Sequence, residues 1–208
     1  MEKIGRKERE HLAHRGEILR AAEKVFAAKG FFQATMNEIA EAAEFGTGTL
    51  YKFFKSKEDL FFILIDEKTE EINGPVKDEL LKKAPAIERI KNILRLQLEF
   101  IERNRDFFRI YASEGSRFEW KVMSSCGNQI HEKMVAYIHL LAQVMKQGMG
   151  EGKLKSMDPL DLAHAFEGIV HSFIFEWLIS PESYPLISKA ETILEIFLNG
   201  TEKKERRK

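Results

Sequence analysis

Hydroxyl and ammonium groups gather in residues 45–57, a short stretch near the start of the chain. The stretch contains three lysines and no acidic residue. Ammonium and hydroxyl groups that project from a helix and its following turn are suited to contact phosphate oxygens. Gly48 lacks a side chain, so the backbone beside it is open to close approach by another molecule. The same composition also fits a short solvated helix whose lysines keep it soluble. The groups concerned are Thr47, Gly48, Thr49, Tyr51, Lys52, Lys55 and Lys57.

Two short helices with a tight turn between them are predicted to position these groups. Apolar residues at helical spacing give each helix one buried side, with Ile39 in the first helix and Leu50 and Phe54 in the second. Thr35 and Glu38 have the spacing of a capping box, in which each side chain accepts a hydrogen bond from an amide of the first turn. Only a turn fits between the two helices, so the pair is predicted to be a helix-turn-helix.

A longer helix is expected on either side of this pair. The helix before it ends at Gly30, and the helix after it covers residues 57–73 and stops at Gly74 and Pro75, a pair that cannot continue a helix. Residues 1–56 would then form a three-helix domain. The helix after this domain would act as a lever that connects it with the rest of the chain.

Both ends of the chain are charged. Residues 1–13 are expected to be a solvated arm before a first helix that starts at about Ala13, and residues 201–208 are expected to be a charged tail. The alternative for the arm is that it lies along a nucleic-acid backbone. No apolar segment follows the first charges, so no secretory signal is expected.

The helix-turn-helix resembles the N-terminal DNA-binding domain of the TetR family of bacterial transcriptional regulators. The likeness covers residues 14–65 and is carried by the run GTLYKFFKSKEDL, by IAEAA before it and by Thr35. The resemblance implies that Thr35 caps its helix against a phosphate and that Tyr51 and Lys57 hold phosphates. It also implies that three side chains lie near base edges. These are Thr47, Thr49 and Lys52.

Three positions depart from the family's pattern. Glu44 stands in the turn where the family usually has glycine, and a non-glycine residue costs about 1 kcal/mol there if its backbone must be left-handed. Gly46 and Thr47 stand where a serine and a lysine usually begin the recognition helix. Glycine caps a helix less well than serine by a few tenths of a kcal/mol, and the missing lysine removes one contact to a base or a phosphate.

Residues 75–200 are predicted to be helical throughout, because apolar residues recur with a helical period and no segment alternates over the length of a strand. The fold class is therefore all-α. The resemblance adds that the N-terminal helix-turn-helix domain is followed by a C-terminal helical domain for ligand binding and dimerisation. The expected helices of this second domain span residues 85–104, 106–118, 128–148, 159–179 and 188–199.

The helix over residues 159–179 is apolar on nearly all sides, so it must be covered on all sides. Its outer face and surplus apolar positions of the last helix could bury against a second copy. The alternative is a monomer that folds over its own helices. A homodimer suits a palindromic DNA operator with half-sites about 34 Å apart, and the family dimerises through these two helices. The predicted dimer interface consists of Ala165, Gly168, Ser172, Phe175, Ile179, Ile193 and Phe197.

Aromatic and methionine side chains of the C-terminal domain are predicted to converge between its helices. Such a cluster is more often simply packed core. In a TetR-like regulator, however, a small-molecule effector binds at this place, and methionine and aromatic side chains suit a flat or chain-like apolar ligand. The predicted pocket residues are Phe100, Phe107, Tyr111, Trp120, Met134, Tyr137, Phe166, Phe173 and Trp177.

Nothing in the sequence indicates an enzyme, a cofactor or a metal site. No two of the six histidines lie at i, i+4 with a carboxylate nearby, as a zinc-binding helix requires. Cys126 is the only cysteine, has no catalytic signature around it and fits a reducing cytoplasm. No uninterrupted apolar stretch approaches the roughly 18 residues of a membrane span, so no membrane contact is expected.

The sequence therefore predicts a cytoplasmic, dimeric, ligand-responsive DNA-binding transcriptional regulator. The predicted mode is that of a repressor, which releases its operator when a small apolar or aromatic effector binds. The alternative class is a DNA-independent helical carrier of apolar small molecules. Such a carrier would keep the pocket but would show no salt-dependent binding to DNA.

Overall fold

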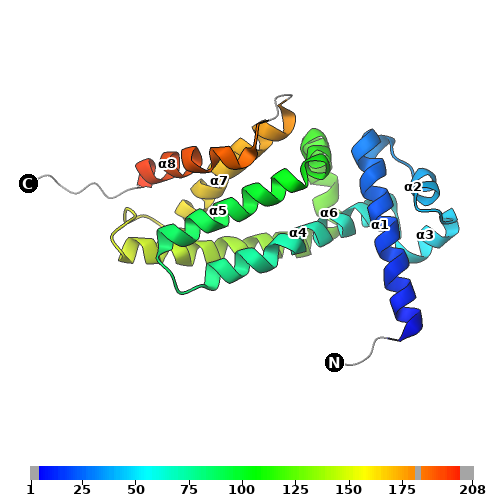
Figure 1. Ribbon diagram of the computed structural model, residues 1–208, viewed down its shortest axis with the longest axis horizontal. Coiled ribbons are helices and arrows are strands. Elements are labelled where there is room, and N and C mark those ends of the chain that lie inside the picture. The colour runs from blue at the N-terminus through cyan, green and yellow to red at the C-terminus, as the bar shows by residue number, and fades with distance from the viewer. Residues whose placement is uncertain (1–4, 181–183, 202–208) are drawn as a thin grey trace, which may run out of the picture. The chain divides into compact units, whose positions relative to one another are not determined.

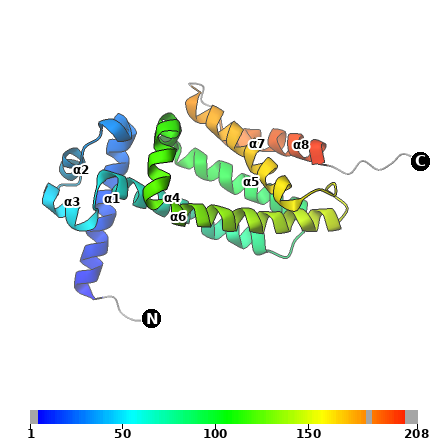
Figure 2. The ribbon, with the colours of Figure 1, turned by 180° about the vertical axis from the view of Figure 1, so that it is seen from behind.

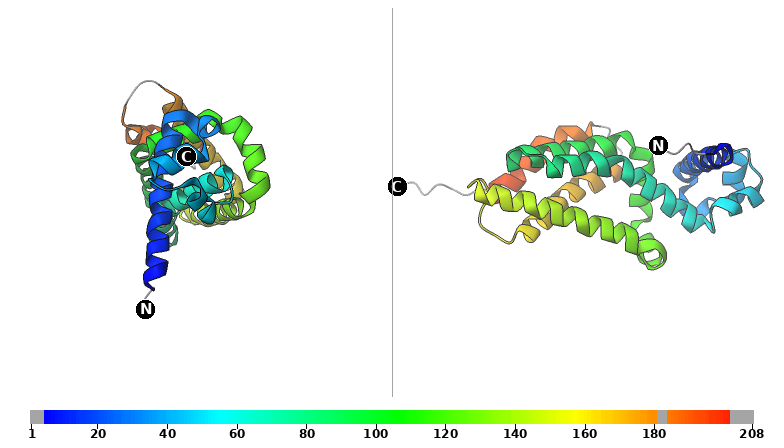
Figure 3. Two further views of the ribbon diagram at one scale, coloured as in Figure 1. Left: turned by 90° about the vertical axis from the view of Figure 1, so that its right-hand side faces the viewer. Right: turned by 90° about the horizontal axis from the view of Figure 1, so that it is seen from below.

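The part of the chain that the structure describes is built of helices joined by short connections. The computed structural model describes residues 5–180 and 184–201, except for the side chains of residues 110–131 and 201, and no β-strand occurs in this part (Figure 1). Figures 2 and 3 show the same helices from other sides. The all-α class is thus confirmed. The helices are α1 (Arg6–Gln33), α2 (Met36–Ala42), α3 (Thr47–Phe53), α4 (Lys57–Leu81), α5 (Ala86–Arg103), α6 (Arg105–Gly150), α7 (Pro159–Ile179), the 3₁₀ helix η1 (Leu186–Lys189) and α8 (Ala190–Thr201).

The helices form two compact units. The first unit contains the chain up to Lys68 together with Asp106–Cys126, and the second contains Thr69–Arg105 and the chain from Gly127 onward. Two long helices, α4 and α6, each contribute residues to both units.

In the first unit, α1, α2 and α3 enclose a small apolar core. α1 packs on α2, and α2 packs on α3 (Figure 1). Because α2 and α3 have only seven residues each, too few to be stable alone, they depend on this core. Burying one large apolar side chain contributes about 1.5–3 kcal/mol. The core side chains, each at most 1% exposed, include Ile18, Ala22, Phe26, Ile39, Leu50 and Phe54.

The first helix is longer than the sequence predicted. α1 begins at Arg6 instead of about residue 13, so residues 6–13 of the expected arm are helical. Arg6 supports the first turns through an ion pair with Glu10 at 2.8 Å, one helical turn away. Near the other end, Gly30 (φ 77°, ψ 164°) interrupts the helical backbone as the predicted stop signal, and a further short helical stretch after this kink ends at Gln33.

The turn after α2 is a Schellman motif. Phe45 N donates to Ala40 O at 2.9 Å, and Glu44 N donates to Glu41 O at 3.1 Å. This motif requires a left-handed residue, and Glu44 has a φ of 59°. The sequence expectation for this non-glycine position is confirmed.

Replacing Glu44 with glycine is expected to stabilise the protein by up to about 1 kcal/mol, because glycine adopts a left-handed backbone without the steric cost of a Cβ atom. Urea unfolding followed by circular dichroism measures the difference. Glu41→Gly is the matched control, since Glu41 lies within α2 and glycine there is expected to destabilise the helix. Two variants that are destabilised alike would contradict the assigned backbone strain.

α4 continues through Gly74 and Pro75 to Leu81, so the predicted end of the helix before this pair is wrong. A proline inside a helix removes one backbone hydrogen bond and costs about 3 kcal/mol. The turn after Pro75 buries apolar surface, since Val76 is only 6% exposed. Packing of this kind is not visible in the local sequence and outweighs the local signal.

Arg89 of α5 holds the C-terminal end of α4. Its guanidinium donates to Glu79 O at 3.2 Å, to Leu80 O and to Gln147 Oε1 at 2.6 Å. Arg89 is only 7% exposed, and burial lowers its pKa, although the nearby carboxylates of Glu79 and Glu151 raise it. The free carbonyls at the C-terminal end of α4 therefore accept hydrogen bonds from the buried guanidinium, and the guanidinium caps the helix.

α6 is one helix from Arg105 to Gly150, whereas the sequence predicted two helices, over residues 106–118 and 128–148. This prediction is wrong. The serines and glycines of the segment each lower helix propensity by no more than about 1 kcal/mol, and the segment contains no proline. Nothing in it therefore forces the helix to stop.

In the second unit, α5 packs on α7 and α8, and α7 packs on α8 (Figure 1). α7 begins after Asp158, whose carboxylate accepts hydrogen bonds from Leu160 N at 2.7 Å and Asp161 N at 3.2 Å. These two hydrogen bonds cap the N-terminus of α7 and fix its start at Pro159, as expected for the helix over residues 159–179. By length and composition alone α7 could cross a membrane, and 39% of its most apolar window is buried within the protein.

Candidate DNA-binding surface and effector domain

The N-terminus of α2 carries the predicted capping box. Glu38 N donates to Thr35 Oγ1 at 3.2 Å, and Thr35 N donates to Glu38 Oε2 at 2.9 Å. A hydrogen bond from Lys29 at 2.6 Å, together with those from Thr35, lowers the pKa of Glu38. The ionised carboxylate is therefore the stabilising form, and its contribution is lost as the pH falls through this lowered pKa. Thr35 itself stays exposed at the positive end of the helix.

α3 presents most of the predicted contact groups to solvent. Tyr51 is 55% exposed, and Gly48, Lys52 and Lys55 are exposed as well. Thr49 is half-buried. These groups lie on one short helix or directly after it. The major groove of DNA admits an α-helix, so this surface has the size and the chemistry to enter it.

Two further residues, which sequence reasoning missed, hold α3 in place. The Thr47 hydroxyl donates to Asn37 Oδ1 of α2 at 2.9 Å. His11 of α1 stacks on Phe53 of α3 with ring centroids 4.4 Å apart. Only the extension of α1 back to Arg6 brings His11 to α3, so the sequence pattern contained no signal for this contact.

Lys57 has a different environment from the other predicted contact residues. Its ammonium donates to Phe31 O at 2.7 Å and to Ala34 O at 2.8 Å, and it also donates to Phe32 O at 3.2 Å. The ammonium lies 4.5 Å from the centre of the Phe31 ring. Because an ammonium group has three hydrogens, these three carbonyls engage all of them. Lys57 therefore closes the turn between α1 and α2, and the phosphate contact implied by the resemblance stays a prediction.

Gly48 has no structural role that explains its lack of a side chain. A Cβ atom built at this position would have no other atom within 4 Å. Gly48→Ala is therefore expected to stabilise α3 by up to about 1 kcal/mol, because alanine favours the helix. If DNA approaches this backbone closely, the same methyl group is expected to weaken DNA binding roughly tenfold. Thermal unfolding and fluorescence anisotropy with labelled DNA measure the two effects. Unchanged DNA affinity would contradict close approach at this position.

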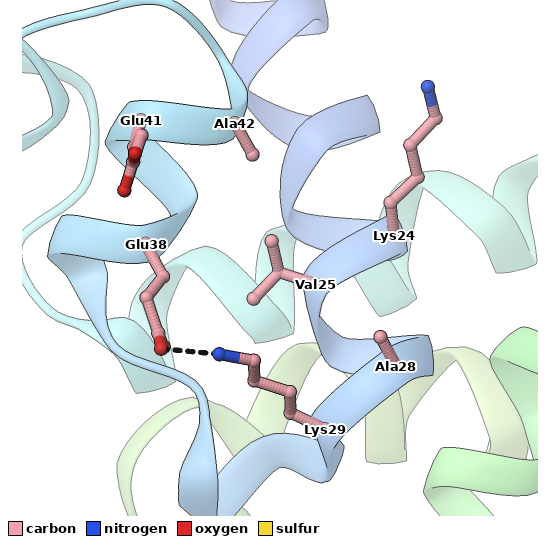
Figure 4. A pocket seen from close by; sticks show the side chains of 7 residues that line it. All are labelled: Lys24, Val25, Ala28, Lys29, Glu38, Glu41 and Ala42. Atoms are coloured by element: carbon pink, nitrogen blue, oxygen red, sulfur yellow. Dashed lines mark hydrogen bonds and ion pairs between the residues drawn. The ribbon is translucent and has the colours of Figure 1, made fainter.

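A shallow depression lies between α1 and α2 in the first unit (Figure 4). Lysines of α1 stand on one side and glutamates of α2 on the other, and the ion pair between Lys29 and Glu38 spans it at 2.6 Å. An open site with both signs of charge does not suit an apolar effector. Its lining consists of Lys24, Val25, Ala28, Lys29, Glu38, Glu41 and Ala42.

The predicted effector pocket is only partly brought together. Phe100, Tyr137 and Phe173 of the second unit are half-buried. Phe166 and Trp177 are 0% and 2% exposed and belong to the packed core, as the alternative interpretation held.

Four other predicted pocket residues are not part of this group. Met134 is 54% exposed. Phe107 belongs to the first unit, where its ring lies 6.4 Å from that of Phe61. The side chains of Tyr111 and Trp120 lie outside the described residues.

The predicted dimer face is exposed on α7 but not on α8. Ala165, Gly168 and Ser172 are exposed, and so are the Phe175 and Ile179 side chains, at 52% and 58%. In α8, by contrast, the residues predicted for the interface lie on the side of the helix that faces the protein core. Ile193 and Phe197 are 0% and 1% exposed, and the Phe197 ring packs against Phe166 at 5.2 Å, so their assignment to the interface is wrong. The apolar side chain that α8 exposes is Ile196, at 48%.

Comparison with known proteins gives matches along most of the chain. The family model for bacterial regulatory proteins of the tetR family matches residues 18–63. The model for the C-terminal region of YsiA-like proteins matches residues 65–200, which is more than half of the chain.

Among individual relatives, the fatty acid metabolism regulator protein of Bacillus subtilis is 23% identical over 90% of this chain and 95% of its own length. The nucleoid occlusion factor SlmA of Aliivibrio fischeri is 30% identical over 82% of this chain and 86% of its own length. The crystal structure of the regulator FadR from Bacillus subtilis in complex with stearoyl-CoA covers 88% of this chain and 97% of its own, with a TM-score of 0.77 at 22% identity. That structural likeness shows a shared fold. The sequence analysis left a regulator and a DNA-independent carrier as alternatives, and the family models together with the exposed α3 surface favour the regulator. The chain belongs to the TetR family and is a ligand-responsive, DNA-binding transcriptional regulator.

Proposed function

We propose that the protein is a cytoplasmic homodimeric repressor that binds a palindromic operator and releases it when a long-chain acyl-CoA binds the second unit. The DNA-binding part is carried by one observation, the exposed surface of α3 and its following turn. Tyr51, Lys52 and Lys55 offer a hydroxyl and two ammonium groups there, and Gly48 leaves the backbone open. Lysine and hydroxyl groups of this kind bind phosphates and set the register of a protein on DNA.

The acyl-CoA proposal is supported by the relatives. The relative from Bacillus subtilis is a fatty acid metabolism regulator protein. The structure of FadR from Bacillus subtilis, which has the same fold, contains stearoyl-CoA. The second unit offers half-buried aromatic side chains, Phe100 on α5 and Phe173 on α7, two helices whose buried side chains are mostly apolar. Such surroundings suit a long apolar chain.

A second copy is supported by the outer surfaces of α7 and α8. Phe175, Ile179 and Ile196 are each about half exposed, at 52%, 58% and 48%, on two helices that pack on each other. Small residues beside them, Ala165 and Gly168, would let a partner helix approach closely. Apolar surface on adjacent helices is typical of a dimer interface, and a two-fold axis there gives a four-helix contact.

Release follows from a shift between two populations. The acyl-CoA favours a conformation of the dimer in which the two copies of α3 no longer match the half-sites. To lower operator occupancy tenfold, the ligand must bind the released form more tightly by about 1.4 kcal/mol.

The test is a fluorescence anisotropy titration of the full chain with the DNA upstream of its own gene. If each subunit contacts three phosphates, the logarithm of the affinity is expected to fall with the logarithm of salt at a slope of about −5. A slope near zero would remove the DNA-binding assignment of α3.

Stearoyl-CoA is then added to the complex, with free coenzyme A and free stearate as matched controls. Of these three ligands, only stearoyl-CoA is expected to release the DNA. Release by coenzyme A without the chain, or no release by any of the three, would overturn the effector class while leaving the DNA result intact.

A further inference from the structure

A partly buried polar cluster, the Glu167 cluster, lies in the second unit and consists of Gln97 of α5, Tyr137 of α6 and Glu167 of α7. Glu167 is only 6% exposed. Its carboxylate accepts hydrogen bonds from the Tyr137 hydroxyl and from Gln97 Nε2, the latter at 3.1 Å, and Gln97 Nε2 is also 3.0 Å from the Tyr137 oxygen. Burial and the charge of Glu167 raise the pKa of Tyr137, so the phenol remains a donor.

The surroundings of the Glu167 cluster are apolar. Gln97 is flanked on α5 by Leu94 and Leu98, both 0% exposed. Glu167 is flanked on α7 by Phe166 and Val170, which are also 0% exposed. A polar group in such a place costs stability unless every donor and acceptor is satisfied. The hydrogen bonds of this cluster can therefore be tallied one by one.

The tally shows an excess of acceptors. The hydrogens available from Gln97 Nε2 and Tyr137 are directed within the cluster, toward Glu167 and the phenol oxygen. Gln97 Oε1 is buried and has no hydrogen-bond partner in the described part of the chain. The second carboxylate oxygen of Glu167 has the imidazole of His171 at 3.6 Å, a side chain that is 65% exposed. What the cluster lacks is a donor, and it already holds a negative charge.

We propose that the Glu167 cluster binds a hydroxyl group carried on the otherwise apolar chain of the effector, with Gln97 Oε1 as the acceptor. This inference depends on the proposed acyl-CoA function and narrows it to hydroxylated acyl chains. A carboxylate or phosphate is excluded from the cluster by the charge of Glu167, so the polar head of the ligand lies elsewhere. A neutral hydroxyl supplies the missing hydrogen bond at a neutral acceptor, and an unmodified chain leaves that acceptor unpaired.

The test compares ligands by their ability to release the wild-type protein from its operator. Stearoyl-CoA is set against a series of hydroxystearoyl-CoAs with the hydroxyl at positions along the whole chain. At least one hydroxylated isomer is expected to release DNA at a concentration roughly tenfold lower than stearoyl-CoA, the effect of pairing one buried acceptor. If every isomer is equal to or weaker than stearoyl-CoA, the hydroxyl site is wrong.

The variant Gln97→Leu replaces the acceptor with an apolar group. It is expected to abolish the preference for the hydroxylated chain and to keep or improve release by stearoyl-CoA. Gln143→Leu is the matched control, because Gln143 is exposed on α6, and it is expected to keep the preference. If the preference for the hydroxylated chain survives in Gln97→Leu, a group other than Gln97 Oε1 binds the hydroxyl.

A purely structural role for Gln97 predicts a different pattern, in which both ligands lose potency together in Gln97→Leu. That pattern also overturns the inference. If no acyl-CoA of either kind releases DNA, the proposed effector class fails, and the hydroxyl site fails with it. Failure of the narrower inference alone leaves release by stearoyl-CoA in place, so the two failures are distinguishable.

Discussion

Phe175→Glu is expected to convert the protein from a dimer to a monomer and to weaken operator binding roughly a hundredfold. Phe175 is 52% exposed on α7 and belongs to the proposed dimer face. A carboxylate there would have to be buried against a copy of itself, and taking these charges out of water costs several kcal/mol. Two linked recognition helices bind DNA about a hundred to ten thousand times more tightly than one, so loss of the dimer lowers affinity by at least the smaller factor.

Light scattering at micromolar concentration measures the mass, and the anisotropy titration measures the affinity. Met157→Glu is the control, because Met157 is equally exposed, at 51%, but lies outside α7 and α8. It is expected to leave mass and affinity unchanged. A Phe175→Glu protein that remains dimeric would place the interface elsewhere on the molecule.

The outer side of α8 shows where a sequence pattern stops being informative. Four apolar residues in five positions, from Ile193 to Phe197, give this helix apolar groups on more than one side. Which side faces inward is decided by neighbouring α5 and α7, and these neighbours are distant in sequence. The periodicity therefore predicted the helix correctly and its buried face wrongly. α7 was easier to predict, because Asp158 and the proline after it mark its start by local hydrogen bonding alone.

The ends of α1 and α4 show the same difference between a local signal and the effect of residues that are distant in sequence. Gly30 acts on its own backbone, so its stop signal could be read from the sequence. Gly74 and Pro75 carry an equally strong local signal, yet α4 continues, because Arg89 and buried side chains hold the turns after them. A local breaker is thus decisive only where no distant residue stabilises the continued helix.

Within the candidate DNA surface, residue type and spacing predicted which groups gather on α3 but not what each one does. Lys55 and Lys57 are both lysines two positions apart in a basic turn. Lys55 is exposed, whereas Lys57 reaches back across the chain to three carbonyls in the last turn of α1 and just after it. Only the folded backbone brings those carbonyls within reach, so the sequence gives both lysines the same apparent role.

Lys57→Met is expected to lower the free energy of unfolding by about 2 kcal/mol, because methionine keeps the apolar stem but leaves carbonyl oxygens without a charged donor. Phe31 O at 2.7 Å and Ala34 O at 2.8 Å lose their closest donor. These carbonyls lie directly before the capping box of α2, so the loss is expected to loosen the start of the helix-turn-helix. Urea unfolding measures the stability.

The salt dependence of DNA binding separates this role from a phosphate contact. Lys55→Met removes an exposed ammonium from the same turn and is expected to reduce the magnitude of the salt slope by about 2 per dimer, one released counterion per subunit. Lys57→Met, measured at a temperature where it remains folded, is expected to leave the slope as in the wild type. If Lys57→Met reduces the slope as much as Lys55→Met and leaves stability unchanged, its ammonium leaves the carbonyls for a phosphate when DNA binds. Lys57 would then be a DNA contact, not the closure of the turn after α1.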